Sequence, residues 1–427
     1  MSSYSCCPLY LLLFLSEKKQ KDAATIRAKN KKMRILYLVS FCFILTLGKA
    51  QNLPTELVQL INQTVQNNLG LQAAQLQVDK YQAQIKTAYT FDKTNVYYSY
   101  DQNNLALNNL PLKVFGAQQR FDFPTVYGAQ KKMYTSEYER EKSFLALQKN
   151  KLNAQVSQLY NQVVYVQHQQ KTYQYLDSLY ENFSKASARK FELGETNYLE
   201  KINAQAKFQR IRTLLTQLAK EKESLHAQLK ALLPNFQPQN IQSQELEPLP
   251  IALIKENKAL YTEYFQNIGK VYQSQLQLQK QQWLPQINLE YFRGKNAMLS
   301  QSLYGFQVGL AIPILFSGNV AKTKVARLEY QSWEQQQKNQ ENQLDNFVLQ
   351  KRNELQKHQL ALDYYQQTGK KLASEIIKVA SKSFKNGEID FFQYIQSLEN
   401  ATTIEMDYLQ TVSLYNQTAY ELYYLNY

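Results

Sequence analysis

The chain carries one unusual pattern twice, and this repeat limits its possible folds more than any other feature. Each copy opens with an aromatic-Gly-x-Gln block, continues to a proline and a long run poor in helix breakers, and ends in Phe-x-x-Gly-Glu. The two copies comprise Phe115, Gly116, Gln118, Pro124, Phe191, Gly194 and Glu195, and Tyr304, Gly305, Gln307, Pro313, Phe384, Gly387 and Glu388. Their offset is about 189 residues at the start and about 193 at the end. The pattern predicts two related halves of one structure, residues 51–240 and 241–427, and excludes two unrelated globular domains.

Residues 1–50 precede the first half and have the composition of a leader. Residues 33–50 resemble a secretory signal peptide, because Arg34 and nearby lysines are basic, residues 35–47 are apolar, and Gly48-Lys49-Ala50 resembles a cleavage site. The apolar stretch is too short for a comfortable membrane-spanning helix. Residues 1–32 have two open interpretations: an upstream extension from a misassigned start codon, or a genuine and unusually long leader.

The leader holds much of the charge and all of the cysteine. The full chain has 49 basic and 35 acidic side chains and a net charge of +14. Nine of the basic and two of the acidic residues lie in residues 1–50, so the remainder has a net charge of +7. The net charge is therefore much weaker evidence for a nucleic-acid partner than the full chain suggests. Cys6, Cys7 and Cys42 also lie in the leader, so we expect no disulfide and no thiolate metal site in the mature chain.

Very long helices are predicted in both halves. Residues 129–193 contain neither Gly nor Pro, and as one helix they would reach roughly 98 Å. Residues 195–233, 319–386 and 388–427 are similarly uninterrupted except at Gly369, and residues 56–88 and 251–282 predict two further helices. Apolar residues recur at coiled-coil spacing, which indicates helices packed side by side. Examples are Leu152, Val156, Leu159, Val163 and Val166, then Ile211, Leu215, Leu218, Leu225, Leu229 and Leu232, then Leu344, Val348, Leu355 and Leu362. Gly194 and Gly387 each lie between two such runs and predict helical hairpins.

Four segments alternate with period 2 and predict two strand hairpins, at residues 94–123 and 286–312. The bulky faces hold Val96, Tyr98, Tyr100, Phe115, Phe121, Ile287, Leu289, Tyr291, Tyr304, Phe306, Val308, Leu310 and Ile312, and the opposite faces hold small or polar residues such as Gly116, Gln118, Gly305 and Gln307. Strands of ~9 residues with one bulky face are typical of a lipid-exposed, water-lined barrel. Backbone groups in lipid must be paired, and four strands cannot close a barrel. We therefore expect a dimer or trimer at least.

With these features the chain resembles the TolC-like outer-membrane factor family from Gln51 to its C-terminus. The resemblance rests on the doubled architecture, the strand-to-helix block, the tip motifs at residues 189–199 and 383–392, and Asn67-Asn68 in the first helix. It implies a mainly α-helical fold with membrane β-structure: a homotrimeric β-barrel with four strands per chain that continues into a long α-helical barrel. It further implies the outer-membrane channel of a tripartite efflux system, a passive conduit served by a periplasmic adaptor and an inner-membrane RND-type pump. The outer membrane of a Gram-negative bacterium, with a periplasmic extension, would be its location. Within the family, the heavy-metal efflux branch looks closest.

The resemblance also implies three groups of site residues. The tips expected to dock the adaptor are Gly194, Glu195, Leu199, Gly387, Glu388 and Phe392. The expected pore constriction comprises Asp390, Gln393, Gln396 and Glu200, and the expected strand-to-helix transitions are Pro124 and Pro313. Some family members carry acidic residues six and nine positions after the second tip glycine, where this chain has Gln393 and Gln396. Either the gate is less charged here, or Asp390 and Glu200 replace those acids.

Other function classes have less support in the sequence. His168, His226 and His358 lack ligand spacing, and no phosphate loop, nucleophile elbow or His-Glu-x-x-His motif occurs. We therefore expect no enzyme, no cofactor and no metal site. A periplasmic adaptor would bring compact β-domains rich in Gly and Val, and a filamentous coiled coil would lack the four strands. A type I secretion exit duct would share the channel architecture, so it stays open as an alternative. A passive conduit selects little, so the sequence does not name the exported substrate.

Overall fold

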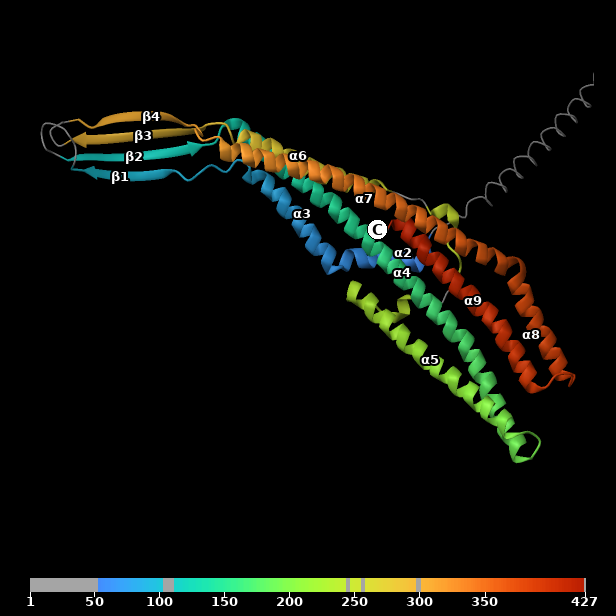
Figure 1. Ribbon diagram of the computed structural model, residues 1–427. Helices are drawn as coiled ribbons and strands as arrows, with labels where there is room; N and C mark the ends of the chain where they lie inside the picture. Colours follow the sequence, from blue (N-terminus) through green and yellow to red (C-terminus); the bar gives the residue numbers. More distant parts are fainter. Residues whose placement is uncertain (1–52, 103–110, 243–245, 255–257, 297–300, 426–427) are drawn as a thin grey trace, which may run out of the picture. The chain divides into compact units, whose positions relative to one another are not determined.

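A computed structural model describes residues 53–102, 111–242, 246–254, 258–296 and 301–425 (Figure 1). The leader expected at residues 1–50, with its signal peptide at 33–50, lies outside these residues. The helices are α2 (Thr55–Asn67), α3 (Leu69–Thr87), α4 (Pro124–Glu192), α5 (Tyr198–Leu232), α6 (Ala259–Gln281), α7 (Ser317–Tyr364), a π turn (Tyr365–Gly369), α8 (Lys370–Lys385) and α9 (Phe391–Tyr424). The strands are β1 (Asn95–Asp101), β2 (Leu112–Phe121), β3 (Gln286–Asn296) and β4 (Leu303–Ala311), and short 3-10 turns occupy Pro238–Asn240 and Ile251–Leu253.

The predicted long helices are confirmed. Helix α4 has 69 residues and begins with Pro124 at its first position, where the missing N–H costs nothing. The run from Ser317 to Lys385 has the same length, but the π turn interrupts it. Most of the predicted heptad positions are buried, among them Val156 and Val163 in α4 and Leu229 in α5. The helices form two sets of neighbours, α3-α4-α6-α7 and α5-α4-α9-α8, each in this lateral order (Figure 1).

The single helix predicted over residues 56–88 is wrong at Asn68. This residue has an extended backbone that ends α2, and its side-chain oxygen accepts a hydrogen bond from the Leu71 N–H at 3.0 Å, which caps α3. Its amide also donates to the Leu232 carbonyl at 2.9 Å, at the end of α5. A capping side chain satisfies the orphan donors of a helix start, so the break is stabilised where it occurs.

The two strand-to-helix transitions differ. Pro124 is the first residue of α4, whereas α7 begins only at Ser317, four residues after Pro313. These four residues account for the growth of the repeat offset from about 189 to about 193. In this connection Ile314 and Leu315 are 81% and 87% exposed.

The strands form one antiparallel sheet in the order β1-β2-β3-β4. The two predicted hairpins pair with each other through β2 and β3, so strands from both halves share the sheet. The register places the predicted bulky residues on one face, since Tyr98 pairs with Phe115, Ala117 with Tyr291 and Tyr291 with Phe306. The edges of the sheet, β1 and β4, have no further strand among the described residues.

The largest hydrophobic core lies between α2, α4, α5 and α9. Its buried members include Val163, Leu229 and Tyr420. The connection between the halves packs onto this core: the Leu249 N–H donates to Asn416 Oδ1 at 2.8 Å, and Asn416 Nδ2 donates to the Glu247 carbonyl at 2.9 Å. The hydroxyl of Tyr415 donates to the Leu249 carbonyl at 3.1 Å. These bonds join the connection to α9.

Candidate functional site

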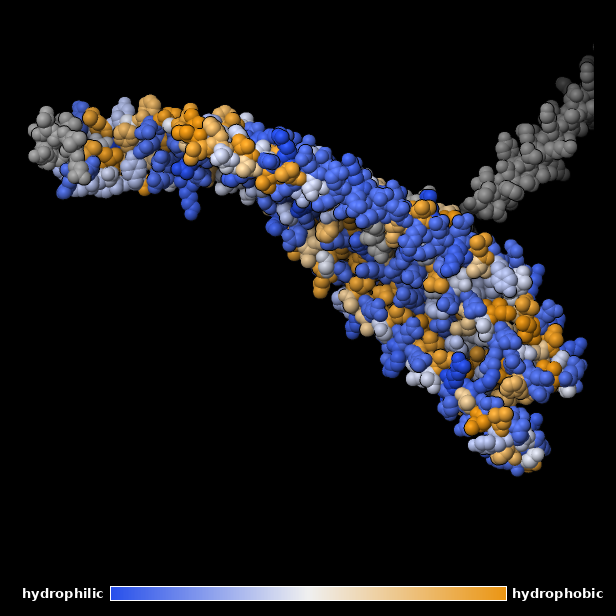
Figure 2. Space-filling view, in the orientation of Figure 1, coloured by the Kyte–Doolittle hydropathy of each residue, from blue (hydrophilic) through white to orange (hydrophobic). Residues whose placement is uncertain are grey.

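One face of the sheet exposes large apolar side chains. Tyr304 and Phe306 on β4 are 77% and 78% exposed, and Val96, Tyr98, Phe115, Leu289, Tyr291, Val308 and Leu310 are exposed on the same face. Apolar residues are visible along β3 and β4 in Figure 2. A monomeric soluble protein rarely exposes so large an apolar patch, so this face is suited to contact with lipid or with another protein.

Packing on the opposite face of the sheet explains why each copy of the repeated block has a glycine. Tyr97, Gly116, Phe292 and Gly305 form one row across the four strands. The ring of Tyr97 lies over Gly116, where an added Cβ would be 2.4 Å from Tyr97 Cζ. The ring of Phe292 lies over Gly305 in the same way, at 2.5 Å from an added Cβ. The row therefore alternates aromatic rings with glycines that leave room for them.

The adjoining row on this face is polar. Gln118 of the first block pairs with Glu290, and Glu290 pairs with Gln307 of the second block. The Tyr97 hydroxyl donates to Glu290, so a side chain of β1 reaches across β2 to β3. This contact connects three strands through side chains, in addition to the backbone ladder.

The two hairpin tips have the same backbone conformation and the same backbone hydrogen bonds. Gly194 and Gly387 both have φ of 74°, the left-handed region that favours glycine. The Glu195 N–H donates to the Lys190 carbonyl at 2.8 Å, and the Glu388 N–H donates to the Ser383 carbonyl at 2.8 Å. These are the bonds of a Schellman motif, which ends a helix and reverses the chain. Beside the first tip, Leu199 is 66% exposed, an apolar side chain without cover in this chain.

The side chains after each tip glycine cap the next helix. Asn197 Oδ1 accepts from the Glu200 N–H at 2.9 Å, and Thr196 donates to the Glu200 carboxylate. Asp390 Oδ1 accepts from the Gln393 N–H at 2.7 Å, and the Gln393 side chain accepts from the Asp390 N–H at 3.2 Å. The second pair is a complete capping box, so two of the residues expected at the constriction start α9. Gln396 is exposed one turn further along.

Glu388 is ionised over a wider pH range than an isolated glutamate. Hydrogen bonds from Asn386 Nδ2 at 3.1 Å and Ser383 Oγ at 2.8 Å lower the pKa of its carboxyl group. The tip therefore presents an anion at neutral and mildly acidic pH.

A polar cluster that the sequence did not indicate joins both hairpins. Glu399 on α9 accepts a hydrogen bond from the buried Tyr180 on α4, and Lys207 Nζ on α5 lies 2.5 Å from Glu399 Oε2. The Lys207 ammonium is also 5.6 Å from the ring centre of Phe392, a predicted tip residue. Burial and the hydrogen bond to Glu399 raise the pKa of Tyr180, so its hydroxyl remains a donor at physiological pH. The three residues lie far apart in the sequence, and no local pattern marks them.

Searches of the described residues for metal sites and membrane-spanning helices, and of the sequence for related families and curated proteins, gave no match. No group of three or more His, Cys, Asp or Glu residues in the described part of the chain is arranged to hold a metal ion. Among the same residues, no helix is both long enough and apolar enough to cross a membrane. No protein-family model matches the sequence, and neither does any curated protein.

Solved structures, in contrast, match most of the chain. A membrane protein from Pseudomonas aeruginosa has a TM-score of 0.73 at 14% identity, over 88% of this chain and 91% of that chain. The CmeC outer membrane channel of Campylobacter jejuni gives 0.71 at 12% identity, over 87% and 86% of the two chains. The MtrE outer membrane channel of Neisseria gonorrhoeae gives 0.71 at 16% identity, over 86% and 88%. The chain has the fold of TolC-family outer-membrane channels. The TolC-like resemblance of the sequence is thus confirmed at the level of the fold, with a mainly helical chain and a small antiparallel sheet.

Proposed function

We propose that three copies of this chain form a channel through the outer membrane of a Gram-negative bacterium. In this proposal each copy gives four strands to a shared β-barrel, and its long helices form a tunnel in the periplasm. The two repeats of the sequence supply equivalent parts of this wall. The channel is a passive conduit and not an enzyme. A TolC-like fold in proteins described as outer membrane channels supports the proposal.

The four-stranded sheet carries this proposal. Its bulky face is exposed, and its edge strands β1 and β4 lack further partners among the described residues. Backbone groups at a sheet edge must find partners before the sheet can lie in lipid, and a closed barrel supplies them. Pairing of β4 in one copy with β1 in the next satisfies both edges. Four strands per copy and three copies reach a size at which barrels close.

The two outer helices of the set α3-α4-α6-α7 also have surfaces suited to contact between copies. On α3, exposed residues recur at heptad spacing, and they are Leu69, Ala73, Leu76, Lys80, Ala83 and Thr87. On α7, exposed Ala321, Val325, Leu328 and Ser332 follow the same spacing, whereas Ala326 and Trp333 of this helix are buried. A second seam of this kind is typical of a helix with neighbours on both sides. We infer that α7 of one copy packs on α3 of the next.

The tips are the proposed contact with a periplasmic adaptor, and through it with an inner-membrane pump of the RND type. An exposed Leu199, an exposed anion at Glu388 and a rigid glycine turn in each hairpin support a docking role. Heavy-metal efflux remains the branch that the sequence resembles. The pump would select the cargo, because a passive wall discriminates little.

The first prediction tests assembly and conduction together. The purified chain in mild detergent is expected to give a native mass of three copies, because closure of the sheet needs strands from its neighbours. The same preparation is expected to produce steps of ion conductance in a planar bilayer. A stable monomer would contradict the barrel, and trimers that never conduct would contradict the channel.

The second prediction concerns the constriction at the start of α9. Asp390→Asn removes a charge but retains the cap, because asparagine caps helices as well as aspartate does. If three copies place Asp390 around a narrow pore, the variant is expected to lower cation selectivity, measured as a smaller reversal potential under a salt gradient. Glu388→Gln is the matched control, since Glu388 is held by its own hairpin. Unchanged selectivity in Asp390→Asn would move the constriction to Glu200.

A further inference from the structure

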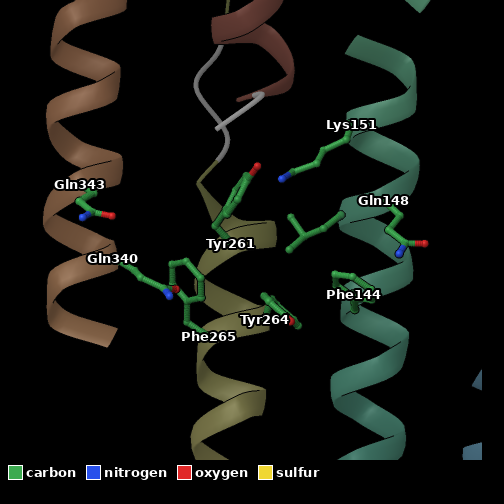
Figure 3. A pocket seen from close by; sticks show the side chains of 9 residues that line it. Phe144, Gln148, Lys151, Tyr261, Tyr264, Phe265, Gln340 and Gln343 are labelled. Carbon is green, nitrogen blue, oxygen red and sulfur yellow. The ribbon is translucent and has the colours of Figure 1, made fainter. Parts of the chain in front are cut away.

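A cavity of about 460 Å³ opens between α4, α6 and α7 (Figure 3). It belongs neither to the exposed sheet face nor to the tips, and no part of the channel proposal uses it. Its lining residues are Phe144, Leu147, Gln148 and Lys151 on α4, Tyr261, Tyr264 and Phe265 on α6, and Gln340 and Gln343 on α7. The volume is within the range of sites that bind small organic molecules.

The floor and one wall of the cavity are apolar and aromatic. Leu147, Tyr261 and Phe265 are buried and belong to one hydrophobic cluster. Phe144 stacks on Tyr264 with ring centres 5.5 Å apart and an angle of 29° between the planes. Tyr261 meets Phe265 edge to face at 6.1 Å. Fixed rings in both orientations favour a flat aromatic ligand over a flexible aliphatic one, because stacking and edge contacts add to simple burial.

The electrostatics of the lining favour a single negative charge. The nine lining residues include one cation, Lys151, and no carboxylate. Lys151 has no hydrogen bond or ion pair to another described residue, and in Figure 3 its ammonium points toward Tyr261. A single ammonium matches a monoanion, whereas a phosphate dianion would require more cations.

We propose that this cavity binds a small aromatic carboxylate. The ring of the ligand packs against Phe144, Leu147 and Phe265, and its carboxylate accepts a hydrogen bond from the Lys151 ammonium. The glutamine amides at the rim, Gln148 and Gln340, are polar neighbours for the part of the ligand that remains in water. This site is independent of the channel proposal, because all its lining residues come from one chain.

The probe for the test is naphthalene-2-carboxylate, with naphthalene-2-methanol as its neutral counterpart. The sequence has two tryptophans, Trp283 and Trp333, and the Trp333 ring lies 6.4 Å from that of Phe265. In a full-length Trp283→Phe chain, Trp333 is therefore the reporter next to the cavity. Titration with the carboxylate is expected to quench Trp333 emission to saturation, and the neutral alcohol is expected to bind at least tenfold more weakly. Equilibrium dialysis of the unsubstituted chain gives the same comparison without a change of tryptophan.

A pair of variants separates recognition by Lys151 from general surface charge. Lys151→Gln is expected to weaken carboxylate binding about tenfold and to leave the alcohol unaffected, since a charged hydrogen bond contributes about that factor. Lys149 is an exposed lysine on the same helix and does not line the cavity. Lys149→Gln is therefore expected to change the affinity for neither ligand. Quenching without saturation, equal affinity for the two probes, or an equal loss in Lys149→Gln would each overturn the proposal. Absence of binding in the assembled protein would mean that another chain fills the cavity, which also overturns it.

Discussion

Replacing Asn416 with leucine is expected to lower the free energy of unfolding by about 2–4 kcal/mol, because the buried Leu249 N–H and the partly buried Glu247 carbonyl would lose their partner. Asn416 is 4% exposed, and it holds the Leu249 N–H and the Glu247 carbonyl. Leucine has a similar volume but offers neither donor nor acceptor. Of the three hydrogen bonds that join the connection to α9, only the one from the Tyr415 hydroxyl would remain. The measurement is the shift of the thermal midpoint, followed by circular dichroism at a fixed heating rate.

Asn346→Leu is the matched control for this experiment. Asn346 is exposed on α7, and its amide donates to the Asn342 carbonyl within the same helix at 2.8 Å. Its loss is expected to shift stability by no more than about 0.5 kcal/mol. Equal shifts in the two variants would show that the bonds of Asn416 contribute little to holding the connection.

Adding one methyl group at Gly116 or Gly305 is expected to reduce trimer assembly sharply. In Gly116→Ala the ring of Tyr97 must leave its position, and its hydrogen bond to Glu290 is lost with it. In Gly305→Ala the ring of Phe292 is displaced in the same way. In Gly116→Ala we expect the lost bond to the Glu290 carboxylate to cost about 2 kcal/mol per copy, and three copies share one barrel in the proposed assembly. The measurement is the fraction of trimer by native mass in detergent.

Gly309→Ala tests whether this effect comes from the rings or from glycine itself. Gly309 lies on the same strand and the same face as Gly305, but the nearest atom to an added Cβ is 3.9 Å away. Assembly of this variant is expected to match that of the unsubstituted chain. A loss in Gly309→Ala as large as in Gly305→Ala would contradict the steric argument.

Features that depend on local spacing could be predicted from the sequence. The long helices, the four strands and the glycine turns all follow from periodicity or from residues that interrupt it, and the structure confirms them as secondary structure. The break at Asn68 was missed because an asparagine within a helical run has two readings, interior or cap, and a contact with Leu232 decides between them. The start of α7 at Ser317 is close to the start of the predicted run at residue 319, because Gly318 interrupts the pattern there.

The candidate sites also differ in whether a local sequence pattern marks them. Asp390 and Gln393 have the spacing of a capping box, a local pattern that is present in the sequence. The same spacing also fits one side of a helix that faces a pore. The cluster of Tyr180, Lys207 and Glu399 was not available, because its members come from three helices. The aromatic cavity is hidden for the same reason, since α4, α6 and α7 each contribute to its wall. Trimerisation, adaptor docking and the constriction remain predictions.

The π turn at Tyr365–Gly369 affects where the long helical run of α7 and α8 can gain or lose residues. An α-helix rotates about 100° per residue, so one residue gained or lost elsewhere would turn every later side chain away from its neighbour. A π turn can accommodate one residue more than an α-helical turn, and packing is maintained on both sides of this one. Tyr365 stacks on Tyr408 at 3.8 Å, Gly369 is buried, and beyond it Ala373 and Ala380 are still buried. Single-residue insertions and deletions are therefore expected to be tolerated within Tyr365–Gly369. Along the rest of the wall, related channels should differ in length by whole heptads.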